Sequence, residues 1–315
     1  MMQYIVILLD DTSVSFCHYD NEKANNRLMP LDTLKSGIQY AMKENLNIQF
    51  VYPNFPIPKE YKQAINSIDH TDIKPAACAN GADVIVFNGI EELKGITALR
   101  NGISCLLRTD RHMLFKHIED ICPILYRAER LNIVITDIKA FTENDFTAYS
   151  KVLNILAKEV ENIYASGKTV QLNLLTDRMM LGKMNNCGAG DSCITLAPDG
   201  KFYVCPAFYL QENGSAVGDI EHGINIKNQQ LYRLDHAPLC RNCDAYQCKR
   251  CIWMNGKTTL EVNTPSHEQC VVAHLERNAS RMLLMAIRKH GTFLPKVDNI
   301  KEINYLDPFD VRKEW

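Results

Sequence analysis

Short, mostly apolar runs recur along the first part of the chain. The first of them, Tyr4–Leu9, has no polar alternation, which is typical of a strand covered on both faces. Six such runs predict six strands, at Tyr4–Leu9, Ile48–Tyr52, Ala82–Phe87, Ile103–Leu107, Asn132–Thr136 and Thr169–Leu174. Strands of this kind favour a parallel sheet.

Helical spacing of apolar residues fills the segments between these strands. A helix is expected to open at Leu31, with Asp32 as its cap and Leu34 and Ile38 on its buried face. Residues 58–68 and 91–100 predict short helices, and residues 110–130 a longer one that Pro123 bends or restarts.

The best-marked helix starts after Thr142, a cap residue, and ends at Gly167. Phe141 and Phe146 flank the cap and predict a hydrophobic staple. A last helix is expected to run to about His290, with Gly291 as its stop.

The alternation of strands and helices predicts an α/β fold of six β/α units. Six units would form an open, partial version of the eight-unit barrel, and a doubly wound open sheet fits the pattern almost as well. After Asp177 the sequence changes to short polar pieces and cysteines. The chain is therefore expected to divide into residues 1–178, residues 179–275, and a helix and tail at residues 276–315.

Charge and composition exclude several classes of partner. The net charge is −2 and charged residues make up 23%, which argues against nucleic acid and anionic membranes as partners. No stretch approaches the roughly 20 apolar residues of a membrane span. The apolar run at the N-terminus lacks the basic flank of a secretory signal. A cytoplasmic location with reduced cysteines is expected, which favours metal ligation over disulfides.

Eight of the twelve cysteines lie between Cys187 and Cys270. The first cysteine group is Cys187, Cys193 and Cys205. The second cysteine group is Cys240-x2-Cys243-x4-Cys248-x2-Cys251, and Cys270 follows it. Thiolates at such short spacings can converge on a metal centre, and eight suffice for two four-thiolate sites.

Structural zinc is the alternative to iron for these cysteines. Zinc ribbons separate their two CxxC knuckles by about 15–20 residues, whereas only four residues separate Cys243 from Cys248. The number of ligands and the glycines around Cys187 favour iron–sulfur clusters over zinc.

Together with the cysteines, Cys187-Gly188-Ala189-Gly190, Pro198-Asp199-Gly200 and Gly218-Asp219-Ile220 resemble a SPASM domain. This domain is the C-terminal extension of radical-SAM enzymes that mature ribosomal peptides, anaerobic sulfatases and quinone cofactors. The resemblance implies a (β/α)6 partial barrel of the radical-SAM type, followed by a SPASM domain with two auxiliary [4Fe–4S] clusters. It implies that cluster I is held by Cys187, Cys193, Cys205 and Cys251, and cluster II by Cys240, Cys243, Cys248 and Cys270.

The sequence departs from the radical-SAM pattern at three places, two before the SPASM-like region and one within it. The loop after the first strand has one cysteine, Cys17, where radical-SAM enzymes have CxxxCxxC. The glycine-rich, acidic segment after the second strand is replaced by Tyr52-Pro53-Asn54-Phe55-Pro56, and Pro206 stands where sulfatase-maturing relatives have a proton-accepting Asp. The combination resembles pseudo-radical-SAM proteins of the CXXX-repeat peptide maturase group. SAM is therefore not expected as a cofactor.

The resemblance implies an accessory role in ribosomal-peptide modification. Such a protein would bind a Cys-rich precursor peptide, work beside a true radical-SAM enzyme, and relay electrons through its clusters. Two alternatives stay open. One is a stand-alone peptide-modifying enzyme, for which the acidic pair Asp10 and Asp11 at the end of the first strand is a weak candidate site. The other is a zinc-stapled binding module.

The remaining cysteines and the histidines near the two groups are expected to have ordinary roles. Cys78, Cys105 and Cys122 are expected to pack as small apolar residues, and Cys17 to be a loop residue. His222, His236 and His267 are expected to be polar loop residues. No catalytic residue is assigned.

Overall fold

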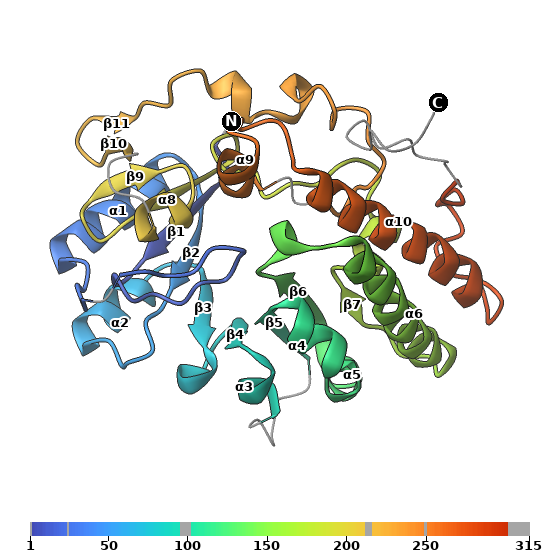
Figure 1. Cartoon of the computed structure of the whole chain (residues 1–315). Coiled ribbons are helices and arrows are strands. Elements are labelled where there is room, and N and C mark those ends of the chain that lie inside the picture. The colour runs from blue at the N-terminus through green and yellow to red at the C-terminus, as the bar shows by residue number, and fades with distance from the viewer. Residues whose placement is uncertain (1, 24, 95–101, 212–215, 249–250, 302–315) are drawn as a thin grey trace. The chain divides into compact units, whose positions relative to one another are not determined.

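The computed structural model describes residues 2–23, 25–94, 102–211, 216–248 and 251–301 (Figure 1). The chain forms two compact units: unit 1 is Met1–Phe87 with Cys187–Ala237, and unit 2 is Asn88–Asn186 with Pro238–Trp315. Each unit contains residues from both sides of the boundary expected at residue 178. That expected boundary rests on sequence motifs and stays a prediction. Within the described ranges no helix is both long and apolar enough to cross a membrane.

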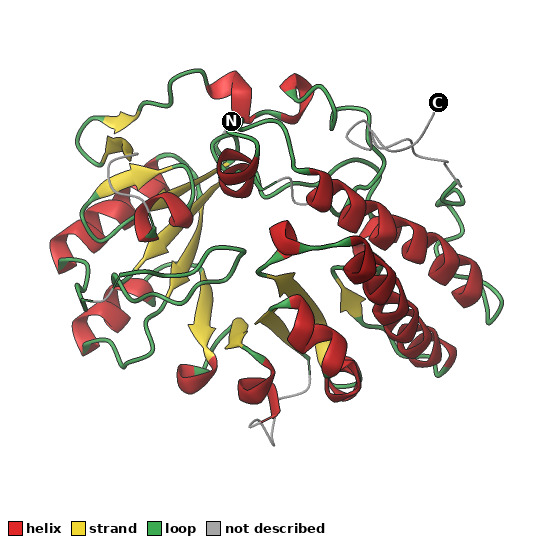
Figure 2. Cartoon of the chain, in the orientation of Figure 1, coloured by secondary structure: helices red, strands yellow, loops and turns green. Residues whose placement is uncertain are grey.

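Unit 1 is built on a sheet whose central strands are parallel, shown as arrows in Figure 2. Its strands follow the order β11-β10-β9-β8-β1-β2-β3-β4. The strands are β1 Tyr4–Leu8, β2 Asn47–Val51, β3 Thr71–Pro75, β4 Val84–Asn88, β8 Cys193–Leu196, β9 Lys201–Tyr203, β10 Ala216–Asp219 and β11 Gly223–Ile224. β1 pairs in parallel with β2 on one side and with β8 on the other, while β8, β9 and β10 pair antiparallel.

The core of unit 1 lies between this sheet and its helices. The helices are α1 Leu31–Lys43, α2 Lys59–Ile65, α8 Pro206–Leu210 and the 3₁₀ turns Ala76–Cys78, Gln229–Tyr232 and Leu234–His236. Ile7, Leu34 and Phe50 are completely buried there, and each contributes roughly 1.5–3 kcal/mol by leaving water. α1 approaches the sheet so closely at Gly37 that a Cβ there would lie 2.4 Å from Leu196. A larger residue at this position would require the Leu196 side chain to move.

Unit 2 contains the parallel strands β5 Ile103–Thr109, β6 Ala128–Ile135 and β7 Gln171–Leu172. Its helices are α3 Ile90–Lys94, α4 Arg111–Lys116, α5 Ile118–Leu125, α6 Glu143–Ala165, α7 Thr176–Met180, α9 Ile252–Thr258, α10 His267–Ile287 and the 3₁₀ turn Ile138–Ala140. The long helices α6 and α10 run side by side (Figure 1). The buried Tyr149 of α6 donates its hydroxyl to Glu276 of α10 at 2.7 Å, so a polar pair fixes how the two helices pack.

The prediction for α6 is confirmed in detail. Thr142 and Asp145 form a reciprocal capping box, and the rings of Phe141 and Phe146 lie 5.7 Å apart, as a staple requires. Gly167 has φ +78°, the left-handed conformation that ends many helices.

Other sequence predictions need correction. α1 is preceded by Pro30, and Asp32 lies in its first turn rather than at its cap. Residues 110–130 are not one helix, because the chain breaks at His117 and β6 begins at Ala128. Of the helix predicted at residues 91–100, the structure describes Ile90–Lys94 as helical, and residues 95–100 lie outside the described residues.

Strand β3 (Thr71–Pro75) was not predicted, because Ile73 is its only strongly apolar side chain apart from the terminal proline. Its polar residues are satisfied locally: Lys74 pairs with Asp72 at 2.7 Å. The strand forms because it lies between β2 and β4, which supply its hydrogen-bonding partners.

Candidate metal sites

The loop that carries Cys187 and Cys193 is a tight turn built on glycine. The Gly188 carbonyl accepts backbone N–H groups from Asp191, Ser192 and Cys193 at 2.8–2.9 Å. Gly188 has φ +67°, and a Cβ on it would lie 2.1 Å from the Ser192 hydroxyl. The turn therefore needs glycine, and it brings the backbone of Cys193 back to the residue that follows Cys187.

Cys193 and Cys205 are joined by the β8–β9 hairpin. The hairpin pairs Thr195 with Tyr203 and Leu196 with Phe202. Cys193 is the first residue of β8, and Cys205 follows the last residue of β9 by two positions. Both cysteines therefore lie at the same end of the hairpin.

A ring from the following 3₁₀ turn packs against this loop. A Cβ on Gly190 would lie 2.6 Å from the ring of Tyr232 and 2.9 Å from Val204, the neighbour of Cys205. Burial, and then the charge of Cys205, raise the pKa of Tyr232. Gly190 therefore allows an aromatic ring to cover the cysteine loop.

The thiol of Cys193 lies in a strongly desolvated position. Burial, and then the charges of Cys187 and Cys17, raise its pKa to about 12. Cys17, which the sequence gave no reason to connect with the first cysteine group, therefore belongs to the electrostatic surroundings of Cys193.

The second cysteine group begins as a knuckle-like turn in unit 2. The N–H of Cys243 donates to the Cys240 carbonyl at 3.0 Å, and the N–H of Cys248 to Ala245 at 2.9 Å. The Ala245 N–H points at the sulfur of Cys243, 3.4 Å away. A backbone N–H aimed at a cysteine sulfur stabilises the thiolate form that binds metals.

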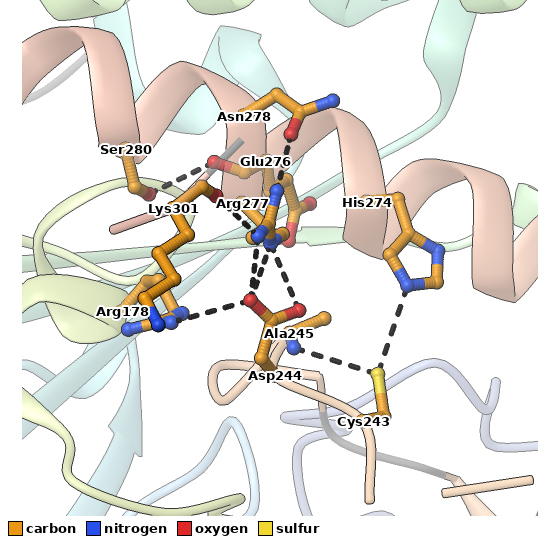
Figure 3. Close-up of polar contacts among 10 residues, drawn as sticks. All are labelled: Arg178, Cys243, Asp244, Ala245, His274, Glu276, Arg277, Asn278, Ser280 and Lys301. Atoms are coloured by element: carbon orange, nitrogen blue, oxygen red, sulfur yellow. Dashed lines mark hydrogen bonds and ion pairs between the residues drawn. The ribbon is translucent and has the colours of Figure 1, made fainter. Parts of the chain in front are cut away.

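A buried ion pair fixes this turn to α10, as Figure 3 shows. Asp244 accepts from Nε of Arg277 at 2.8 Å and from Nη2 at 2.6 Å, and Arg277 is only 2% exposed. Arg178 of α7 approaches the same carboxylate at 3.6 Å and lies over the Tyr246 ring at 4.1 Å. Arg277 also donates to the Lys301 carbonyl at 2.6 Å. The position of Cys243 is therefore set by contacts of the residue that follows it.

Cys251 and Cys270 are connected through two buried amides. Cys251 precedes α9, and Asn255, one turn later, accepts from the side chain of Gln269 at 3.1 Å. Gln269 directly precedes Cys270 near the start of α10, where Ser266 is the N-cap. One hydrogen bond thus joins the helix that follows Cys251 to the residue that precedes Cys270.

Histidine 274 is the residue that sequence reasoning missed at this site. Its Nε2 lies 3.6 Å from the sulfur of Cys243, and it follows Cys270 by one turn of α10. The spacing Cys270-x3-His274 could have identified it, since residues four apart share a helix face.

Among the residues that the structure describes, no three or more Cys, His, Asp or Glu side chains are grouped closely enough to hold a metal ion. Cys187, Cys193 and Cys205 belong to unit 1, and Cys251, the predicted fourth ligand of cluster I, belongs to unit 2. The donor set still suits iron or zinc, because thiolates on turns with inward N–H groups are the ligands that both prefer. The two ligand sets stay predictions.

Asp10 and Asp11 are buried at the end of β1. Asp10 accepts the N–H and the hydroxyl of Thr12 at 2.7 and 2.6 Å. Asp11 accepts the hydroxyl of Tyr209, whose pKa is raised far above its usual value by burial and then by Asp11. The hydrogen bond between Asp11 and Tyr209 connects the loop after β1 to α8, so it has a structural role.

The remaining cysteines and histidines singled out in the sequence have ordinary surroundings. Burial raises the pKa of Cys105 and of Cys122 to about 11, as expected of thiols that pack as apolar groups. His222 contacts Asp219 at 2.9 Å in an exposed loop, and His236 contacts Asp235 at 3.0 Å at the end of the 3₁₀ turn Leu234–His236. The prediction of a loop residue is wrong for His267, which is the first residue of α10 because Ser266 caps the helix. Its ring packs edge-on against Phe146.

No protein-family model and no curated protein matches the sequence. Among solved structures, native anSMEcpe with bound AdoMet and the Cp18Cys peptide matches with a TM-score of 0.62 at 12% identity, covering 92% of this chain and 100% of that chain. Native anSMEcpe with bound AdoMet gives 0.60 at 14% identity, covering 90% and 99%. anSMEcpe is an anaerobic sulfatase-maturating enzyme of the radical-SAM and SPASM class. At these identities the similarity establishes the fold alone: the chain has a radical-SAM-like α/β fold, as predicted from its sequence.

Proposed function

We propose that this chain is an accessory protein of ribosomal-peptide modification that binds two [4Fe–4S] clusters and does not cleave SAM. One combination carries the proposal: a radical-SAM-like fold, eight cysteines arranged as in a SPASM domain, and a single cysteine in the loop after β1. Because a SAM-binding cluster needs three thiolates there, the fold is expected to retain only its auxiliary metal chemistry.

The proposed ligands of cluster I are Cys187, Cys193, Cys205 and Cys251, and those of cluster II are Cys240, Cys243, Cys248 and Cys270. The glycine turn at Cys187, the β8–β9 hairpin, and the link from Asn255 to Gln269 support these sets. Bound clusters would supply one-electron transfer. The chain's own residues would hold them and, as Tyr232 does at Gly190, cover the loops with apolar surface.

The proposed partners are a Cys-rich precursor peptide and a true radical-SAM enzyme. The matching structure of anSMEcpe with the Cp18Cys peptide supports a peptide as the ligand of this fold. The missing SAM-cluster motif supports a second protein as the source of the radical chemistry.

A zinc-stapled binding module is the second candidate. The observation that favours it is the turn at Cys240 and Cys243, in which the Ala245 N–H and His274 both face the sulfur of Cys243. Thiolate and imidazole donors on such a turn are a common ligand set for structural zinc.

Metal content separates the two candidates. Protein purified without oxygen should contain about eight iron and eight sulfide per chain and show a broad visible absorption that bleaches on reduction. With dithionite and SAM it should form no 5′-deoxyadenosine. Cys78→Ser is the matched control and should keep the full iron content. One or two zinc ions and no iron would refute the cluster proposal in favour of the binding module.

A further inference from the structure

His274 approaches the predicted cluster II site from helix α10. It lies one turn after Cys270, a predicted ligand, and on the same helix face, since residues four apart stack. Its Nε2 is 3.6 Å from the sulfur of Cys243, a second predicted ligand that is 31 residues away in the sequence (Figure 3). One imidazole therefore contacts the sulfur of one predicted ligand and follows a second predicted ligand by one helical turn.

The sulfur of Cys243 is contacted from two directions. The Ala245 N–H reaches it from within its own turn at 3.4 Å, and His274 reaches it from α10. N–H groups directed at a cysteine sulfur stabilise the thiolate, the form in which cysteine binds a metal.

The contact cannot be lost by a small shift of the loop. Asp244, which follows Cys243, is held by the Nε and Nη2 atoms of Arg277 on α10. His274 and Arg277 are three residues apart on that helix, so the buried ion pair and the imidazole act on the same two residues of the turn. Moving Cys243 away from His274 would break this ion pair.

We infer that His274 is a positioning residue for cluster II: its Nε2–H donates a hydrogen bond to the Cys243 thiolate and holds this ligand in place. Hydrogen bonds to ligand sulfurs orient the ligand and raise the reduction potential of an iron–sulfur cluster. The inference deepens the proposed function and rests on it for the redox effect, but the positioning role applies equally to a zinc ion at the same cysteines.

The test uses the full chain, purified without oxygen, and three variants. His274→Leu removes the donor, and His274→Gln keeps an N–H that can reach the sulfur. His290→Leu is the matched control, because His290 follows the same helix but pairs with Glu161. Iron content and the reduction potentials of both clusters are measured, the latter by EPR-monitored titration, with circular dichroism as the check on folding.

We expect His274→Leu to lower one of the two reduction potentials and leave the other unchanged. His274→Gln and His290→Leu should stay close to the unmodified protein. Two unchanged potentials in His274→Leu would overturn the inference. Loss of about four iron from both His274 variants would also overturn it, since His274 would then be a ligand itself.

If the unmodified protein contains zinc instead of iron, the proposed function fails and the inference is tested separately. Competition with a chelator then measures zinc affinity. His274→Leu should weaken the zinc site by about 10- to 100-fold, and His274→Gln should restore most of the loss. An unchanged affinity in His274→Leu would refute the positioning role whichever metal is bound.

Discussion

Replacing Arg277 by methionine should destabilise unit 2 through the charge it leaves behind. Arg277 is 2% exposed and donates to Asp244, to the Lys301 carbonyl and, at 2.7 Å, to the side-chain oxygen of Asn278. Breaking a buried pair on one side costs about 3–5 kcal/mol. Asp244 keeps 25% exposure and Arg178 remains 3.6 Å away, so we expect the lower end, about 3 kcal/mol. For a unit of this size that corresponds to a fall of roughly 6–12 °C in Tm.

The assay is differential scanning calorimetry of metal-free and metal-loaded protein. Lys158→Met is the control, because Lys158 is 64% exposed and its pair with Glu161 at 2.9 Å is a surface ion pair, worth at most about 1 kcal/mol. Replacing Asp244 by leucine together with Arg277→Met should recover much of the loss, since an apolar pair leaves no buried charge. If Arg277→Met and Lys158→Met melt alike, the ion pair does not support the cysteine turn.

Three further changes test other parts of the structure. Cys251→Ala should remove about four iron per chain if it is the fourth ligand of cluster I, as measured against Cys78→Ser; unchanged iron would exclude that assignment. Gly190→Ala combines φ +78° with a clash 2.6 Å from the half-buried ring of Tyr232 and should cost about 1–3 kcal/mol. Gly182→Ala, with nothing within 4 Å, should be neutral in urea unfolding. Asp145→Asn should cost about 1 kcal/mol at neutral pH. Burial acts to raise the pKa of Asp145, but its capping bonds and Arg111 lower it overall below 3.8. The stabilisation that the Asp145 carboxylate provides is therefore present above pH about 4 and disappears as the pH falls through the folded pKa. If Asp145→Asn and the unmodified protein still differ in free energy of unfolding at pH 2, this reasoning is contradicted.

The parts of the fold that the sequence predicted well are those set by local chemistry. The buried strand β1 follows from its apolar residues, and the limits of α6 follow from Thr142 and Gly167, because caps and periodicity act over a few residues. Strand β3 depends on its neighbours in the sheet, and a segment with Asp72 and Lys74 at its centre gives no local signal for it.

The cysteine pattern predicts both candidate metal sites, but it does not indicate the contacts that surround the cysteines. Asp244 and Arg277 are 33 residues apart, and Cys243 and His274 are 31 apart. Such pairs form only when α10 packs against the cysteine turn. One sequence cannot indicate which of many polar residues will meet in this way, since any of them could equally face water.

Helix α10 also limits how this chain can change in evolution. One face of the helix carries Cys270, His274 and Arg277 toward the cysteine turn, while Glu276 and Ser280 bond to Tyr149 and to the Leu175 carbonyl. Each residue turns a helix by about 100°, so inserting or deleting one residue between Cys270 and Glu276 would rotate Cys270 by that angle relative to Glu276, Arg277 and Ser280. The helix could then not keep all of these contacts. Length variation among relatives should therefore be excluded from this segment and be tolerated in the loops on either side of the helix.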